Sequence, residues 1–458
     1  MPSVTPPAPI AAHSLLVFLL QVGLLLLAAL LLGRLAARFG LPAVAGELCA
    51  GIVFGPSLFG HLAPGLSGWL IPRTATQFHL LDAVGQLGVV LLVGVTGIEI
   101  DVALVRRQGA SALRVGMAGL VIPLALGAAA GYLAPRELVA GSTGRGTFAL
   151  FVGVAMCVSA LPVIAKTLSD MKLLHRAIGQ LTIASAVVDD VSGWLLLSVV
   201  SAMAVSGVHG RTVALSVAYL AAFVLAAVFL GRPLVRAVFA RAQRSGEAGP
   251  AVAAAVVVMV LCAAATQAMG FEAMLGAFFG GLMIGSCGGV DLARLASLRS
   301  VVMWVFAPLF FATAGLRMDL TALGRGTVLL AAVAALAVAV AGKFAGAFLG
   351  ATASRLSRWE ALALASGMNA RGVIQIVVAT AGLSIGVLNT ASYTIIILVA
   401  IVTSIMVPPV LRFAVKRIEC TEEEEIRRRT MAVFREPVLA AASSGAAGRE
   451  EPSSGGAL

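Results

Sequence analysis

Charged residues are scarce in this sequence. Only 12% of its 458 residues are Asp, Glu, Lys or Arg, whereas a typical soluble domain carries about 25%. The hydrophobic fraction is 60%, which is more apolar surface than a soluble core can use. A soluble fold is therefore excluded. Nucleic-acid binding is excluded as the reason for the net charge of +11, because it needs a basic patch on a soluble surface.

Several motifs are also missing. The five cysteines have no paired spacing, which excludes a disulfide framework and a zinc site. No Gly-x-Gly-x-x-Gly motif follows a strand and no filter-like loop is present, so neither a nucleotide-binding regulatory domain nor a channel filter is expected. We also expect no cofactor and no enzymatic activity.

The chain does contain recurring apolar runs of roughly twenty residues, from Ser14 to Phe413. Each is long enough to cross a hydrocarbon core of about 30 Å as a helix. The runs lack the alternation of barrel strands. The sequence therefore predicts an all-α, polytopic membrane protein with about thirteen transmembrane helices, at residues 13–36, 42–59, 79–98, 110–133, 146–168, 176–205, 212–240, 250–269, 272–288, 298–316, 327–353, 359–384 and 389–415.

The distribution of basic residues predicts the orientation. With the N-terminus outside, the cytoplasmic loops hold nineteen Arg and Lys residues and the opposite loops hold six, which satisfies the positive-inside rule. We expect a multi-pass protein of the cell membrane, embedded in the lipid bilayer, with a cytoplasmic C-terminus. Residues 1–418 form this membrane domain. Residues 419–458 are predicted to be a short, disordered cytoplasmic tail, because they are polar and rich in Ser, Gly and Ala.

Three apolar runs contain ionisable side chains, each of which costs at least about 2.5 to 3.5 kcal/mol at that depth. Asp189 and Asp190 lie in ASAVVDDVSGW, Lys343 lies in AVAVAGKFAGAF, and Arg371 lies in GMNARGVIQIVV. Adjacent helical residues point about 100° apart, so one carboxylate can pair while the other stays open. Two acids exceed what one lysine neutralises. This favours a functional site over a buried Asp–Lys pair that only fixes helix packing.

The neighbours of the acidic pair suit a cation. Ser185 lies one helical turn before Asp189, and Ala186 and Gly193 are expected to leave space beside Asp190. Hard cations take oxygen ligands. The sequence therefore predicts that a monovalent cation and a proton bind at Asp190.

Two spans carry predicted breaks. Pro162 stands mid-helix in MCVSALPVIAKTL, where it removes a backbone hydrogen bond and frees carbonyls near Ser159. Glycines and Asn369 surround Arg371 in the twelfth span. Interrupted helices in corresponding positions of two halves indicate a transporter site.

Two further acids are weaker candidates. Glu47 and Glu272 are interpreted as either packing or gate residues. The glycines of GAFFGGLMIG are predicted to permit close helix contact.

Together these segments resemble the cation:proton antiporter superfamily, in the branch of bacterial sodium/proton antiporters, potassium efflux proteins and plant cation/proton exchangers. The resemblance covers nearly the whole membrane portion. It is carried by the acidic pair, the basic residue of the eleventh span and the segments GELCAGIVFGPSLFG, LLVGVTGIEID, VSALPVIAKTLSDMKLL, LGAFFGGLMIG, APLFFATAGLRMDL and NARGVIQIVVATAGL, in the family's order.

The resemblance implies exchange of Na⁺ or K⁺ for protons by an elevator-like movement in a homodimer. It implies two inverted repeats and two broken helices that cross. The dimerisation part covers about 13–98 and 250–316, the core part about 110–205 and 327–415, and a linker helix about 212–240.

The resemblance also assigns roles. In relatives with an Asp-Asp pair, the second Asp is the principal cation ligand and the first pairs with the intramembrane Lys, which implies a cation site at Asp190 and an Asp189–Lys343 pair. Gln375 and Gln86 depart from the pattern, since many relatives have Glu at these positions. If Lys343 gives up its proton when the cation binds, two protons move against one cation and exchange is electrogenic, which we favour over a purely structural brace.

Two other functions are alternatives to cation/proton exchange. A proton-coupled exporter of a drug or ionophore could use the same carboxylates and is left open by the sequence. A sodium-coupled symporter of an organic solute would need a roomy polar cavity, and the spans hold few Asn, Gln or Ser residues to line one.

Overall fold

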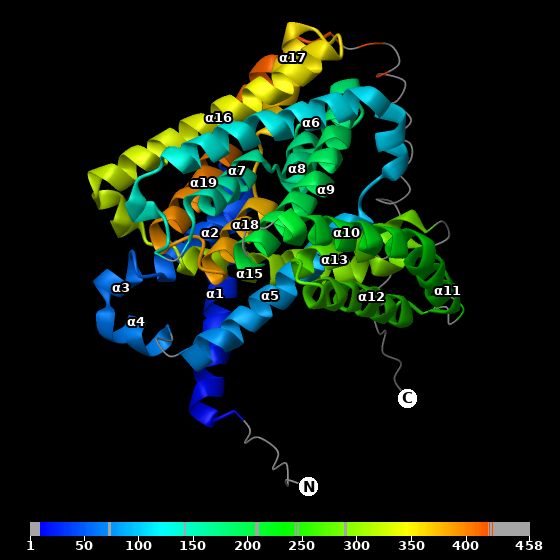
Figure 1. The fold of residues 1–458 in the computed structure, drawn as a ribbon. Helices are drawn as coiled ribbons and strands as arrows, with labels where there is room; N and C mark the ends of the chain where they lie inside the picture. The colour runs from blue at the N-terminus through cyan, green and yellow to red at the C-terminus, as the bar shows by residue number, and fades with distance from the viewer. Residues whose placement is uncertain are drawn as a thin grey trace, which may run out of the picture.

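The computed structural model describes residues 10–71, 75–141, 143–206, 210–242, 244, 247–287, 291–419, 421 and 424. Within these residues the fold is helical, and its β pairing is a single isolated bridge between Val139 and Leu388. The helices (Figure 1) are α1 Ala12–Arg38, α2 Ala43–Phe54, α3 Phe59–Leu62, α4 Pro64–Leu70, α5 Ala75–Ile98, α6 Val102–Leu133, α7 Arg145–Cys157, α8 Leu161–Asp170, α9 Ala177–Ser206, α10 Gly210–Ala226, α11 Arg232–Ala242, α12 Gly249–Ala268, α13 Ala273–Ser286, α14 Ala296–Val301, α15 Ala307–Leu316, α16 Gly326–Ala353, α17 Arg358–Met368, α18 Val373–Ser384 and α19 Thr390–Val415.

The all-helical membrane fold is confirmed, but the count of thirteen full spans is not. Among the described residues, eleven helices are long and apolar enough to cross a bilayer, or twelve if α17 and α18 count as one span bent by 42°. The predicted span 272–288 is α13, which has 14 residues. At 1.5 Å per residue it reaches only about 21 Å, which is short of a hydrocarbon core of about 30 Å.

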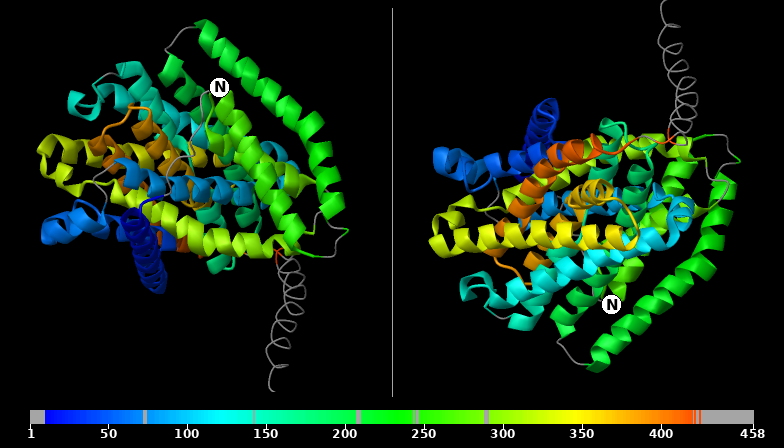
Figure 2. Two further views of the ribbon diagram at one scale, coloured as in Figure 1. Left: turned by 90° about the horizontal axis from the view of Figure 1, so that it is seen from below. Right: turned by 90° about the horizontal axis from the view of Figure 1, so that it is seen from above.

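The helices pack in two groups. In one group the long helices α6 and α16 lie side by side (Figures 1 and 2), with α7 and α9 against α6 and with α17 and α19 against α16. In the other, α2 packs between α1 and α15, and α5 packs along α13 and α15. The α10–α11 arm follows one edge of the bundle (Figure 2) and contacts α9, α12 and α13. The acidic pair belongs to the first group.

Close helix contact depends on glycine in the second group. A Cβ atom at Gly281 of α13 would collide with the backbone carbonyl of Gly94 in α5, and one at Gly51 of α2 would collide with that of Ala312 in α15. The contact predicted for GAFFGGLMIG is therefore present. Because a side chain at either position would push two backbones apart, these glycines set how closely the helices approach.

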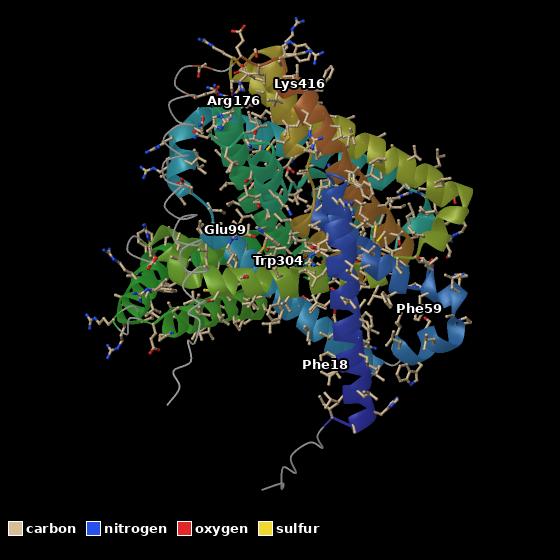
Figure 3. The ribbon with its side chains drawn as sticks, turned by 180° about the vertical axis from the view of Figure 1, so that it is seen from behind. Phe18, Phe59, Glu99, Arg176, Trp304 and Lys416 are labelled. Carbon is tan, nitrogen blue, oxygen red and sulfur yellow. The ribbon has the colours of Figure 1, made fainter. Side chains whose placement is uncertain are left out.

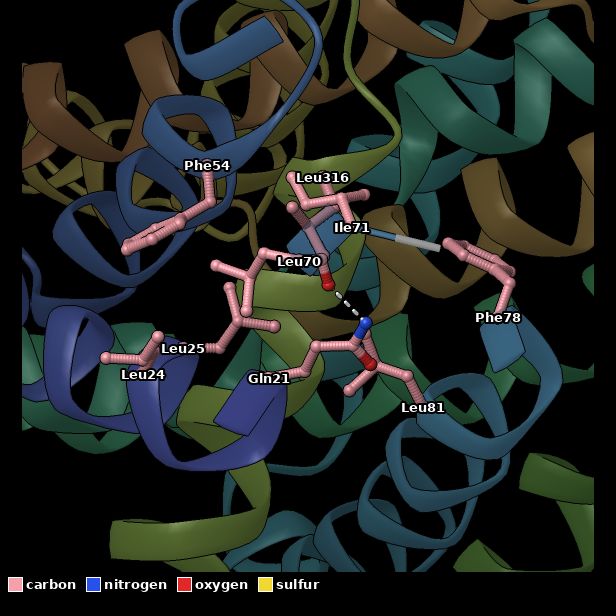
Figure 4. A pocket seen from close by; sticks show the side chains of 9 residues that line it. All are labelled: Gln21, Leu24, Leu25, Phe54, Leu70, Ile71, Phe78, Leu81 and Leu316. Carbon is pink, nitrogen blue, oxygen red and sulfur yellow. Dashed lines mark hydrogen bonds between the residues drawn. The ribbon is translucent and has the colours of Figure 1, made fainter. Parts of the chain in front are cut away.

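A polar side chain ties the first helix to a short neighbour. The Gln21 amide of α1 donates a hydrogen bond of 2.5 Å to the Leu70 carbonyl at the end of α4, beside a small pocket lined otherwise by apolar side chains (Figure 4). A helix end leaves its last carbonyls without intrahelical partners. Gln21 therefore satisfies one such carbonyl where little water is available.

Candidate functional site

The first break lies between α7 and α8. Helix α7 ends at Cys157, the chain is extended through Ala160, and α8 begins at Leu161 with Pro162 in its first turn. The prediction that Pro162 stands in the middle of a helix is therefore wrong. Proline lacks a backbone N–H. Because the N–H groups in the first turn of a helix have no partner within that helix, proline is favoured at a helix start.

The second break lies between α17 and α18, at residues 369–372, which include Asn369 and Arg371. The two breaks contact each other. The Ala160 amide donates to the Ala370 carbonyl at 2.9 Å, and the Ser159 hydroxyl donates to the Met368 carbonyl at 2.6 Å. Two stretches of backbone that lost their helical hydrogen bonds thus satisfy each other in the interior.

Asp189 lies at this contact and is fully paired. The Lys343 ammonium is 2.8 Å from Asp189 Oδ2 and 3.0 Å from Oδ1. The backbone amide of Ser159 donates to Asp189 Oδ2 at 2.8 Å. Both side chains of the ion pair are 0% exposed. The pairing expected for Lys343 is present, and it neutralises one of the two adjacent acids.

Two basic side chains occupy the carbonyl end of α7. Lys343 donates to the Cys157 carbonyl at 2.5 Å, and Arg371 donates to those of Ala155 and Met156 at 3.1 and 2.6 Å. Positive charge is favoured at a helix C-terminus. The last three carbonyls of α7 are therefore bound by basic side chains.

Asp190 differs from its neighbour. Its residue is 1% exposed, no basic side chain among the described residues pairs with it, and its Oδ1 atom has no hydrogen-bond partner there. The Leu161 amide lies against the carboxyl group, at the start of α8. Ser185, Asn369 and Gln375 also hold buried side-chain oxygen atoms without partners. Asp190, which the sequence predicted to lack an ion-pair partner, has none among the described residues.

The space predicted beside Asp190 is partly filled. A Cβ atom at Gly193 would come within 2.7 Å of Val158 Cγ1, so the extended segment after α7 packs on this glycine. Gly193 admits the neighbouring chain rather than leaving room for an ion.

One contact was not predicted from the sequence. Glu424 pairs with Arg176 at 2.9 Å and accepts a hydrogen bond of 2.6 Å from the Ala177 amide, at the start of α9. Arg176 and Lys416 lie at the same end of the molecule (Figure 3). Most of the predicted tail, 419–458, lies outside the described residues. The run of acids from Glu422 to Glu425 was the available signal, and it does not identify a partner.

Fold and site define a polytopic membrane protein whose buried acidic pair lies where two broken helices meet. A family model described as "Sodium/hydrogen exchanger, transmembrane" matches residues 24–417. The chain belongs to this family.

Three proteins with similar sequences are named as cation/proton antiporters. The chain is 30% identical to Cation/H(+) antiporter 18 of Arabidopsis thaliana over 86% of its own length and 48% of the relative's. It therefore spans about half of that protein. It is 28% identical to Na(+)/H(+) antiporter NhaS4 of Synechocystis sp., covering 87% of this chain and 97% of that one. It is 26% identical to K(+)/H(+) antiporter 1 of Saccharomyces cerevisiae, covering 87% and 46%.

The fold also has a solved counterpart. The sodium proton antiporter MjNhaP1 of Methanocaldococcus jannaschii matches with a TM-score of 0.62 and 17% identity, over 88% of this chain and 99% of that chain. Identity this low concerns the fold alone. The helix arrangement described above is thus one that a known antiporter adopts.

Proposed function

We propose that the protein exchanges a monovalent cation, Na⁺ or K⁺, for protons across the cell membrane. The observation that carries the proposal is the asymmetry of the acidic pair, since Asp189 is paired with Lys343 while Asp190 is buried with an unpartnered oxygen. A buried carboxylate without a counter-ion is costly. A proton or a metal cation removes that cost, and only one of them can occupy Asp190 at a time.

The side chains at and around the acidic pair have different roles. Asp190 holds the proton or the cation, and Ser159, Ser185 and Asn369 offer neutral oxygen ligands on the helices that meet there. Asp189 and Lys343 together contribute little net charge while both are ionised. Release of a proton from Lys343 when the cation arrives makes the exchange two protons for one cation, and therefore electrogenic.

The two packing groups supply the moving parts. Helices within 110–205 and 327–415 form a core that carries the site, and helices within 13–98 and 250–316 form a dimerisation part, with 212–240 as the linker. Alternating access then follows from movement of the core against the other part in an elevator-like manner. The protein acts as a homodimer with its N-terminus outside and its C-terminus in the cytoplasm.

The proposal is tested with the purified protein in proteoliposomes. Addition of sodium, potassium, lithium or rubidium salts is expected to dissipate a pH gradient, read as recovery of a quenched dye, and liposomes without protein are the control. Currents on a solid-supported membrane under a cation gradient are expected to show net charge movement. No response to any of the four cations would overturn the proposal, and exchange without current would leave Lys343 a structural brace.

A further inference from the structure

A polar cavity lies away from the acidic pair. It encloses about 50 Å³ between α18 and the helices α5, α13 and α15, and its polar lining comes from Gln86, Glu272, Thr380 and Ser384. One water needs roughly 10 to 15 Å³ of cavity volume, so the space holds about three to five waters, or a small cation with part of its hydration shell.

Glu272 is the acid in this cavity. It stands at the N-cap of α13, yet its side chain makes no capping hydrogen bond. The described lining contains no Lys, Arg or His, and no ion pair to Glu272 occurs in the described part of the chain.

A second polar group points to the same place. The hydroxyl of Ser201 in α9 is buried beside the Glu272 carboxyl. A carboxylate, hydroxyl oxygens and an amide oxygen around a space of water size form a set that suits a monovalent cation.

Helices α9 and α18 run between the region of the acidic pair and the region of the cavity. Ser201 follows Asp190 by eleven residues in α9, about three helical turns, so both lie on nearly the same face. In α18, Val377, Thr380 and Ser384 recur at helical spacing. Thr380 lies about 10 Å along this helix from Val373, where the second break ends.

We propose that Glu272 and this cavity form a second binding site for the transported monovalent cation, through which the ion passes between Asp190 and the membrane face where α13 begins and α18 ends. This inference rests on the proposed exchange. Binding at Glu272 concentrates the cation on that side of the membrane, whereas Asp190 serves both sides.

The test compares the two faces of the membrane. Exchange is measured in right-side-out and inside-out vesicles, with Na⁺ or K⁺ added to one face at a time. Glu272→Gln is expected to raise the KM for the cation at least about fivefold at the face where α13 begins, with kcat unchanged and the KM at the opposite face unchanged. Glu137→Gln removes an exposed carboxylate hydrogen-bonded to Thr327 and is expected to leave both KM values unchanged.

A second variant tests the inference if the first one misfolds. If Glu272→Gln does not insert, the double variant Thr380→Val with Ser384→Ala decides the question, with an expected rise of about twofold in KM at the same face. An unchanged KM in the decisive variant would overturn the inference, as would an equal rise at both faces. Absence of exchange in the wild type would instead overturn the proposed function.

Discussion

Replacement of Asp190 by Asn is expected to lower cation-driven proton movement at least about hundredfold, because loss of the charged ligand removes several kcal/mol of cation binding. Asn has nearly the shape of Asp and can accept no proton in its place. The Asp189–Lys343 pair does not depend on Asp190, so the variant is expected to fold and insert normally. Dye quenching in proteoliposomes measures the loss.

The matched control is Glu99→Gln. Glu99 is an exposed carboxylate that pairs with Arg299 far from the helix breaks, so this variant is expected to exchange like the wild type. Exchange at wild-type rates by a correctly inserted Asp190→Asn protein would show that another group carries the proton.

Lys343→Gln is expected to reduce the free energy of unfolding by about 3 to 5 kcal/mol, the cost of breaking a buried ion pair. Among the described residues, the Ser159 amide is then the remaining donor to the Asp189 charge in the interior. The Cys157 carbonyl loses its ammonium partner as well. Thermal unfolding in detergent measures the change.

A double-variant cycle separates the ion pair from other effects of the substitution. Asp189→Asn combined with Lys343→Gln leaves no stranded charge, so its loss of stability is expected to be smaller than the sum of the two single losses. Additive losses would mean that the two side chains stabilise the fold independently.

A pairing of Lys343 with one of the two acids was predictable from the sequence because each charge alone is too costly in an apolar run, and the choice of Asp189 followed from the resemblance to relatives with an Asp-Asp pair. The same cost predicted a role for Arg371, but its partners were not predictable. They are backbone carbonyls of Ala155, Met156 and Ala339, and a carbonyl is present at every residue. Which carbonyls are free depends on where α7 ends, and boundaries read from a pattern are uncertain by two to four residues.

Tertiary contacts account for the other differences between the predictions and the structure. Pro162 was assigned to mid-helix because the apolar run continues through it, whereas the structure ends α7 before it and starts α8 with it. Gly193 indicated free space because it has no side chain, but Val158 from a distant segment fills that space. The Glu272 cavity is formed by four helices, so no local pattern could show which face of α18 it meets.

The central claim is that a proton and a cation compete for Asp190, and the dependence of the apparent KM for Na⁺ or K⁺ on pH tests it most directly. The KM is measured in proteoliposomes at a series of equal internal and external pH values. If each bound cation displaces a proton, the KM rises at least about tenfold for each unit that the pH falls in the acid range, while the maximal rate at saturating cation is retained. A KM that stays constant across the pH range of exchange would contradict the account.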